Sequence, residues 1–202
     1  SNAKVIFNGD GSDEVTGGYI YFNNAPNEYD FDKECRRLLN NIHYFDVLRS
    51  DRSISSRWGL EARTPFLDKE FVQYYMAIDP LLKMYNNKNN LPEKYLLRKA
   101  FESDNIIPNE ILWRPKEAFS DGCSSENRSW HIVIKEYIDT LITDDEFNNN
   151  KNKYKINPPS LKESYYYRKI FDDFYPGKEN IIPYFWLPNW SDKIDPSARE
   201  LS

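Results

Sequence analysis

A short acidic, glycine-rich turn follows the first apolar residues of the chain. It contains Gly9 and Gly11 together with the carboxylates of Asp10 and Asp13. Glycine adopts positive φ and lets a bound group approach the backbone, and free N–H groups at a helix start bind phosphate. Carboxylates hold hard cations such as Mg²⁺. The turn therefore predicts a site for a nucleotide with its metal, and a solvated turn capped by Ser12 or Asp13 is the alternative explanation.

A second charged stretch, residues 113–122, contains Lys116 between Pro115 and Gly122. A cationic side chain in a loop of this kind can contact phosphate oxygens. Lysine and glutamate side chains in loops are usually only solvated, so the stretch gives weak support by itself.

Charged and large apolar residues are interleaved in the segment 51–68, which is broken by Gly59 and Pro65. Because buried charges need partners, this pattern predicts a partly buried ion-pair network. We expect its charged residues mainly to clamp a loop rather than to act directly in catalysis; they are Arg52, Arg57, Glu61 and Arg63.

The elements that must position these residues are mostly helical. Val5 to Phe7 is expected to be a buried strand leading into the turn. The pair Gly17 and Gly18 either ends the short helical segment that follows or lets another backbone pack against it. Asp68 is the expected N-cap of a later helix. Apolar residues at three- and four-residue steps predict helices over 31–48, 69–78, 108–112, 130–142 and 161–175.

Three further segments are less regular. Asn90 is expected to cap a helix in capping-box register with Glu93. Residues 143–159 are rich in Asn, Asp and Lys and predict a mobile loop or insertion, and the tail 182–190 is expected to be extended. The residues expected to face the core in the helix after Asn90 and in the helix at 130–142 are Leu96, Leu97, Ala100, Phe101, Ile134, Tyr137, Ile138 and Leu141.

Composition narrows the class of protein. The chain has 202 residues, 16% aromatic residues and a formal net charge of −5, so we expect a folded protein without affinity for nucleic acid or membranes. Cys35 and Cys123 are far apart and are expected to be free thiols in a reducing compartment. Two isolated histidines are too few for a zinc site or a histidine-based triad. With no apolar run of about 20 residues, the expected location is the cytoplasm.

Four segments, in the same order along the chain, resemble glutamine-hydrolysing asparagine synthetases. FNGDGSDEVTGGYIYFNNAP is similar to that family's S-G-E-G-S/A-D-E-x-x-G-G-Y segment, and RWGLEARTPFLD is similar to W-G-x-E-x-R-x-P-F-L-D. WRPKEAFSDG resembles the R-x-K-E-x-F-S-D-G loop, and the end of the chain, DPSARELS after PYFWLPNW, resembles the family's C-terminus. The resemblance covers nearly all of the 202 residues.

This resemblance implies a fold and a reaction. The 202 residues, mostly α by themselves, would be a fragment of an α/β synthetase domain of the adenine nucleotide α-hydrolase type. In the family, ATP and aspartate give β-aspartyl-AMP and pyrophosphate with Mg²⁺. Ammonia that a separate N-terminal domain makes from glutamine then attacks the adenylate to form asparagine. The resemblance allows for a homodimer of the full-length form.

The resemblance also assigns roles to single residues. Asn8 and Gly9, with Gly11 and Ser12, would contact the nucleotide. Asp10 occupies a glutamate position that is associated with forming the intermediate and handling protons from ammonia. Asp13 would bind Mg²⁺, and Lys116 would contact the phosphates or the pyrophosphate. Residues expected to order the site from further away are Glu14, Glu61, Arg63 and Asp68.

The sequence departs from the family pattern at two positions and lacks two motifs. Asn8 replaces serine, and Asp10 replaces glutamate and is one methylene shorter, so activity falls unless the backbone compensates. The pyrophosphate loop S-G-G-x-D-S and the glutamine-hydrolysing cysteine do not occur in these residues. Ser1 to Ala3 are typical of a cleaved tag. We therefore expect residues 4–202 to be the C-terminal part of the synthetase domain, and inactive without the rest.

Three alternatives are consistent with parts of the sequence. Another adenylating amidoligase, such as a β-lactam synthetase, shares the fold. A non-catalytic nucleotide-binding or interaction domain would explain the change at Asp10. An EF-hand calcium loop fits Asn8, Asp10 and Ser12, but it needs glycine where Asp13 stands and glutamate where Tyr19 stands.

Overall fold

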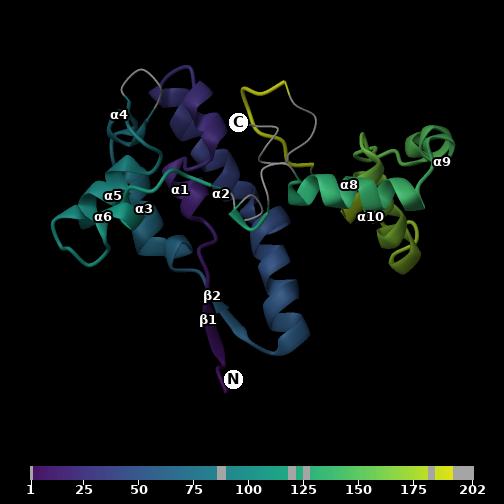
Figure 1. Cartoon of the computed structure of the whole chain (residues 1–202), viewed down its shortest axis with the longest axis horizontal. Helices are drawn as coiled ribbons and strands as arrows, with labels where there is room; N and C mark the ends of the chain where they lie inside the picture. The colour runs from purple at the N-terminus through teal and green to yellow at the C-terminus, as the bar shows by residue number, and fades with distance from the viewer. Residues whose placement is uncertain (1, 86–89, 118–121, 125–127, 182–184, 193–202) are drawn as a thin grey trace. The chain divides into compact units, whose positions relative to one another are not determined.

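The computed structural model describes residues 2–85, 90–117, 122–124, 128–181 and 185–192. The chain divides into two compact units, Ser1–Lys116 and Glu117–Ser202, and each is described by itself. Helices dominate both units, as the sequence predicted (Figure 1). No helix in these described ranges is both long enough and apolar enough to cross a membrane.

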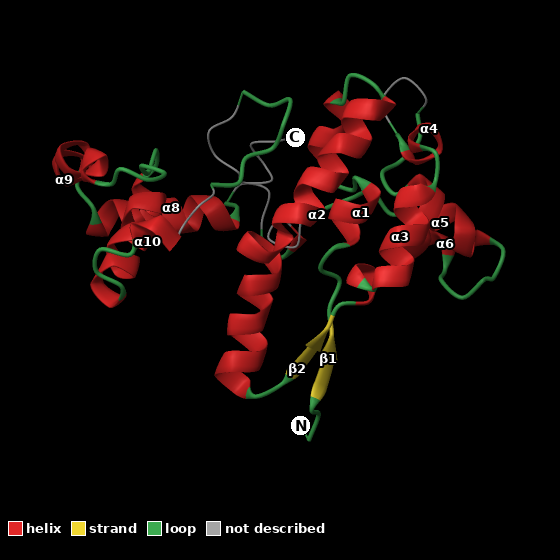
Figure 2. Cartoon of the chain, turned by 180° about the vertical axis from the view of Figure 1, so that it is seen from behind, coloured by secondary structure: helices red, strands yellow, loops and turns green. Residues whose placement is uncertain are grey.

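Two short parallel strands begin the first unit. Strand β1 (Val5–Phe7) pairs with β2 (Glu61–Arg63), with Val5 opposite Glu61 and Phe7 opposite Arg63. The two strands lie side by side (Figure 2). The sequence predicted β1 but not β2, whose three residues show no alternation of apolar and polar types long enough to indicate a strand.

The prediction that β1 is buried was wrong. Its side chains are exposed, Phe7 to 73% of its surface, because β2 is the only strand that pairs with it within the described residues. A parallel strand is normally covered by neighbours on both faces. A groove of about 700 Å³ runs beside these strands, lined by Val5, Phe7, Ala62, Arg63, Thr64, Pro65, Leu67 and Asp68.

The predicted ion-pair network of the segment 51–68 was also wrong where the structure describes it. Glu61 and Arg63 form an ion pair with an N–O distance of 2.5 Å, but both side chains are more than half exposed. Arg57 is exposed beside the ring of Trp58, and the side chain of Arg52 lies outside the described ones. The same uncovered strand pair explains this exposure, since β2 carries two of the charges.

Helix α2 (Glu28–Ser50) is the main packing element of the first unit. It buries Phe31, Cys35, Leu38 and Ile42, which confirms the predicted apolar face. Around this face lie α1 (Ser12–Thr16), the 3₁₀ turn Ile20–Asn24 and α4 (Pro80–Lys83). The rest of the buried apolar set is Val15, Tyr21, Phe22, Ala25, Tyr75, Met76, Met84, Tyr85 and Leu112.

Helix α2 also carries a buried carboxylate. Glu34 is 1% exposed and accepts a hydrogen bond of 2.6 Å from the hydroxyl of Tyr21. Arg37 forms an ion pair with the same carboxylate at 2.6 Å. The buried charge is therefore satisfied by an arginine one turn away, as a buried carboxylate requires.

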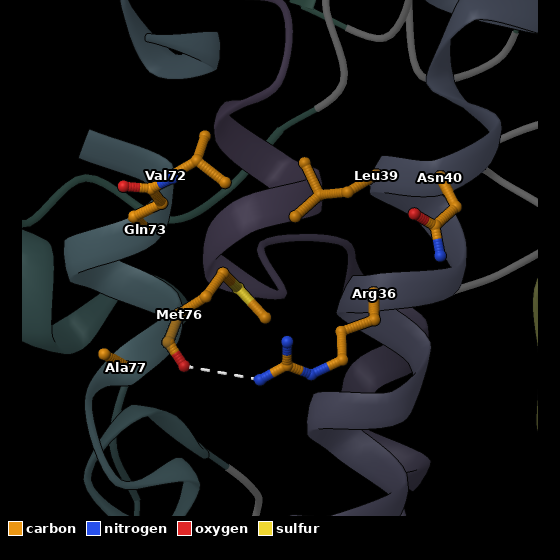
Figure 3. A pocket seen from close by; sticks show the side chains of 7 residues that line it. All are labelled: Arg36, Leu39, Asn40, Val72, Gln73, Met76 and Ala77. Atoms are coloured by element: carbon orange, nitrogen blue, oxygen red, sulfur yellow. Dashed lines mark hydrogen bonds between the residues drawn. The ribbon is translucent and has the colours of Figure 1, made fainter. Parts of the chain in front are cut away.

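Helix α3 (Lys69–Ala77) starts as predicted, because the Asp68 carboxylate accepts hydrogen bonds from the backbone N–H groups of Glu70 and Phe71. Its apolar side is only partly buried: Tyr75 and Met76 are buried, and Phe71, Val72 and Ile78 are intermediate. A groove of about 490 Å³ separates α3 from α2, and the Arg36 guanidinium reaches across it to the Met76 carbonyl at 3.5 Å (Figure 3).

Two short helices, α5 (Tyr95–Glu102) and α6 (Asn109–Leu112), complete the first unit. The prediction that Asn90 caps α5 was wrong, because Lys94 precedes the helix in the left-handed conformation with φ 59°. Ala100 and Phe101, expected in the core, are exposed, whereas Leu96 and Leu97 are partly buried. Helix α6 falls within the predicted range 108–112.

The second unit contains α8 (Trp130–Leu141), α9 (Asp144–Asn150) and α10 (Lys162–Phe174), and α8 and α10 were predicted. Its core is Ile138, Ile142, Tyr154 and Tyr165, with Ile134, Phe147 and Tyr166 packed against it. Tyr137 and Leu141, expected to face inward, are exposed. Of the tail 182–190, residues 182–184 lie outside the described ones and 185–190 form no helix or strand.

The predicted loop at 143–159 was wrong for its first half. Thr143 accepts a hydrogen bond of 3.1 Å from the backbone N–H of Glu146 and starts α9. Threonine followed three residues later by glutamate is a capping-box pattern. The polar composition of the segment favoured a loop, although the spacing of Thr143 and Glu146 indicates the start of a helix.

Candidate functional site

The turn that follows β1 is held at both ends. The backbone N–H of Asn8 donates to the Arg63 carbonyl at 2.9 Å, which fixes the turn against β2. The Asn8 side chain then accepts a hydrogen bond of 2.9 Å from the Asp10 backbone N–H and donates one of 3.0 Å to the Asp10 carboxylate. The two positions at which this chain departs from its family pattern are thus bonded to each other.

Glycine is required where the turn meets helix α1. Gly11 has φ 91°, and a Cβ built there would lie 2.3 Å from the Leu67 side chain. Gly11 occupies the N-cap position, so Ser12 and Asp13 lie inside the helix, and neither caps it as the alternative explanation required. Their side chains are consequently available to other segments of the unit.

Two lysines from distant segments converge on Asp13. The Lys94 Nζ lies 2.8 Å from Asp13 Oδ1, and the Lys116 Nζ lies 3.0 Å from Asp13 Oδ2. The Lys94 ammonium also donates to the hydroxyl of Ser12 at 2.9 Å. We call Asp13, Lys94 and Lys116 the lysine–aspartate cluster, in which two cations face one carboxylate.

The electrostatics of Asp13 follow from this arrangement. Burial by itself raises the pKa of a carboxyl group, but the charges of Lys94 and Lys116 outweigh it and lower the pKa of Asp13 below its ordinary value of 3.8. The carboxylate is therefore ionised at neutral pH. Its Oδ1 is buried and forms an ion pair with the Lys94 ammonium.

The backbone packs closely against this cluster at Gly18. A Cβ built at Gly18 would lie 2.3 Å from Asp13 Oδ1 and 2.4 Å from Lys94 Cε. Gly18 N–H also donates to the Asp13 carbonyl at 2.8 Å, where it helps to end α1. As long as Asp13 and Lys94 keep their positions, therefore, only glycine fits at position 18.

Lys94 is the site residue that sequence reasoning missed. Its backbone lies in the left-handed region, which lysine seldom adopts, and this conformation precedes α5. Lys116, which was predicted, additionally lies 6.0 Å from the ring centroid of Tyr19. The resemblance pointed to the segment of Lys116, whereas Lys94 stands in no motif and was marked by no pattern.

The residues expected to order the site have separate structural roles. Glu14 is 1% exposed and accepts a hydrogen bond of 2.5 Å from the Tyr19 hydroxyl, directly beside the cluster. Asp68 caps α3, as described above. Glu61 and Arg63 pair with each other on the exposed strand pair.

A magnesium ion fits this site only in one manner. In the parts of the chain that are described, no group of three or more His, Cys, Asp or Glu side chains could hold a metal ion. Mg²⁺ characteristically uses one or two carboxylates and completes its shell with water and substrate phosphates. The Asp13 carboxylate, whose Oδ1 pairs with the Lys94 ammonium at 2.8 Å, offers a ligand of this kind.

Comparisons with known proteins agree with the resemblance. The family model described as asparagine synthase matches residues 23–194. The glutamine-hydrolysing asparagine synthetase of Gallus gallus is 49% identical over 201 residues, which is all of this chain and 35% of that protein. The enzyme of Homo sapiens of the same name is 46% identical over 202 residues, again 35% of its length. The chain thus spans about a third of these relatives, and it belongs to the asparagine synthase family.

Proposed function

We propose that these residues form the C-terminal part of the synthetase domain of a longer enzyme, which makes asparagine from aspartate with ATP and glutamine-derived ammonia. The family match and the coverage of 35% of each relative support this proposal. The single observation that carries it is the lysine–aspartate cluster, which gathers two cations beside a glycine-rich turn at the end of a parallel strand.

The chemistry needs such cations. A carboxylate is a poor acyl donor, and the aspartate side chain becomes reactive when its oxygen displaces pyrophosphate from the α-phosphorus of ATP. Negative charge on the departing pyrophosphate increases in that step, and fixed cations stabilise it. Ammonia then attacks the acyl carbon and releases AMP, which leaves asparagine.

In this proposal the two lysines exchange partners when the nucleotide binds. Lys116 contacts the phosphates, and Lys94 contributes a second ammonium from the same cluster. Asp13 would hold Mg²⁺, and this ion would offset phosphate charge. Both ammonium groups of the cluster would then face the anionic ligand.

The turn supplies the remaining contacts. We assign nucleotide binding to Asn8, Gly9, Gly11 and Ser12, because the turn is fixed to β2 and a Cβ at Gly9 would meet nothing within 4 Å. Asp10 is assigned to forming the adenylate and receiving protons from ammonia. Its carboxylate is oriented by the Asn8 amide, which compensates for the shorter side chain.

The test is pyrophosphate release by the full-length protein that contains these residues. With ATP, Mg²⁺ and aspartate we expect release that depends on aspartate, and with added ammonia we expect asparagine. Lys116→Ala should lower the rate roughly a hundredfold or more, because it removes a cation that stabilises charge in the transition state. Lys169→Ala, which breaks a partly buried ion pair of the second unit, is the control.

Two results would refute the proposal. Pyrophosphate release that proceeds equally without aspartate would point to a different amidoligase substrate. A folded full-length protein that binds ATP but releases no pyrophosphate, even with Asp10→Glu introduced, would favour a non-catalytic nucleotide-binding domain.

A further inference from the structure

A single arginine joins the two segments that deliver the lysines of the cluster. Arg98 lies on α5, one turn after Lys94, and its side chain is 14% exposed. Its guanidinium group donates to four acceptors that belong to two separate stretches of chain. Such a fork of fixed donors holds its partners in a defined geometry.

Two of the four contacts hold the approach to Lys94. Arg98 Nε donates to the Glu93 carbonyl at 2.8 Å, and Nη2 forms an ion pair with the Glu93 carboxylate at 2.9 Å. Glu93 directly precedes Lys94, whose left-handed conformation is intrinsically unfavourable. The contacts to the carbonyl and to the carboxylate of Glu93 thus restrain the backbone at the point where Lys94 turns toward Asp13.

The other two contacts hold the approach to Lys116. Arg98 Nη1 donates to the Leu112 carbonyl at 2.6 Å and to the Arg114 carbonyl at 2.8 Å. Leu112 ends helix α6, and carbonyls in a last helical turn lack partners within the helix. Arg114 is two residues before Lys116, so Arg98 fixes the chain just where it leaves α6 for the cluster.

We propose that Arg98 is a positioning residue that sets the two lysine ammonium groups on Asp13 together and so prepares them for the phosphates of a nucleotide. The same guanidinium group restrains both lysine-bearing segments, so the two cations are arranged jointly. The nucleotide part of this inference rests on the proposed function, whereas the positioning part is independent of it.

The first test measures amine accessibility and needs no catalysis. The 202-residue chain and its Arg98→Ala variant are labelled with limiting acetic anhydride, and each lysine is quantified by peptide mass spectrometry. We expect labelling of Lys94 and Lys116 to rise at least threefold together in the variant. Labelling of Lys83, which is 3% exposed and pairs with Asp32, should stay unchanged.

A matched control is present in the second unit. Arg168 is 8% exposed, donates to the Ile156 carbonyl and pairs with Glu179, so it resembles Arg98 in burial and bonding. Arg168→Ala should leave the labelling of Lys94 and Lys116 unchanged. Unchanged labelling of these lysines in Arg98→Ala would overturn the proposal, and so would an equal rise at Lys83, which would show general loss of the fold.

The second test asks whether Arg98 acts through Lys116 in the full-length protein. Arg98→Ala should lower aspartate-dependent pyrophosphate release about tenfold or more, with Arg98→Lys between it and the wild type. Added to Lys116→Ala, the Arg98 change should cost less than it does alone, since one of the two lysines that it positions is already gone. Full additivity would overturn the proposal. If the wild type releases no pyrophosphate, the proposed function fails, and the labelling result still decides the positioning role.

Discussion

Two clusters of charged side chains, one in each unit, differ in the sequence separation of their partners and in the ratio of cations to carboxylates. In the lysine–aspartate cluster, Lys116 reaches Asp13 across 103 residues of sequence, and two cations share one carboxylate. In the second unit Arg168 pairs with Glu179 only 11 residues away, donates to the Ile156 carbonyl and lies 4.9 Å over the ring of Tyr154.

The difference supports the proposal that the lysine–aspartate cluster binds a ligand and the Arg168 cluster does not. Arg168 has one acid, one carbonyl and one aromatic ring as partners, which is a balanced set suited to holding a fold. The first cluster instead gathers two ammonium groups on one carboxylate, at 2.8 Å and 3.0 Å. Such imbalance is costly in a purely structural cluster and useful where an anion and its metal bind.

Removing the shared carboxylate should have the largest effect. Asp13→Asn leaves two ammonium groups without their anion and removes the proposed metal ligand, so we expect pyrophosphate release by the full-length protein to fall about a thousandfold. The steady-state rate with saturating ATP measures this. A loss below tenfold in a folded variant would mean that the first cluster is structural, like that of Arg168.

Crowding the first cluster should have a smaller effect. Gly18→Ala places a Cβ in the space now occupied by Asp13 Oδ1 and Lys94 Cε, so both must shift. A displacement of about 1 Å can cost roughly a hundredfold in rate, and we expect a loss of that order with the thermal unfolding midpoint lowered by a few degrees. Wild-type activity in this variant would contradict the close packing.

Breaking the second cluster should affect stability alone. Arg168→Ala removes a charged hydrogen bond to the Ile156 carbonyl and leaves Glu179 without this partner, so we expect the free energy of unfolding to fall by about 2 kcal/mol. Urea unfolding of the 202-residue chain measures it. ATP affinity of the full-length protein should be unchanged, and a tenfold weaker affinity would remove the distinction between the clusters.

The pH dependence of stability should reveal the lowered pKa of Asp13. Because folding lowers that pKa, the unfolded chain takes up the proton first, and the ionised cluster contributes its full stability above pH 3.8. The contribution is lost as the pH falls through the lower, folded-state value. The stability difference between wild type and Asp13→Asn should therefore shrink below pH 3.8, as measured by urea unfolding, and a constant difference would contradict the assignment.

Much of the helical structure was predictable, because α2, α3, α8 and α10 repeat apolar residues at helical spacing. Helix α9 was missed although Thr143 and Glu146 have capping-box spacing. The exposure of β1 could not be foreseen from its apolar residues, since burial depends on neighbouring strands rather than on the strand itself.

The site was predictable only in part, because some of its contacts depend on segments that are distant in the sequence. Asp13 and Lys116 stand in recognisable segments, and the structure brings them together. Lys94 was not predictable, because its role depends on a left-handed backbone and on packing against Gly18, neither of which has a local pattern in the sequence.

Nucleotide protection of the cluster lysines tests the central claim most directly. The full-length protein is labelled with limiting acetic anhydride with and without ATP, Mg²⁺ and aspartate, and Lys169 of the second unit serves as internal reference. The account predicts that labelling of both Lys94 and Lys116 falls at least fivefold when the nucleotide binds. Saturating ATP that leaves the labelling of both lysines unchanged would contradict it.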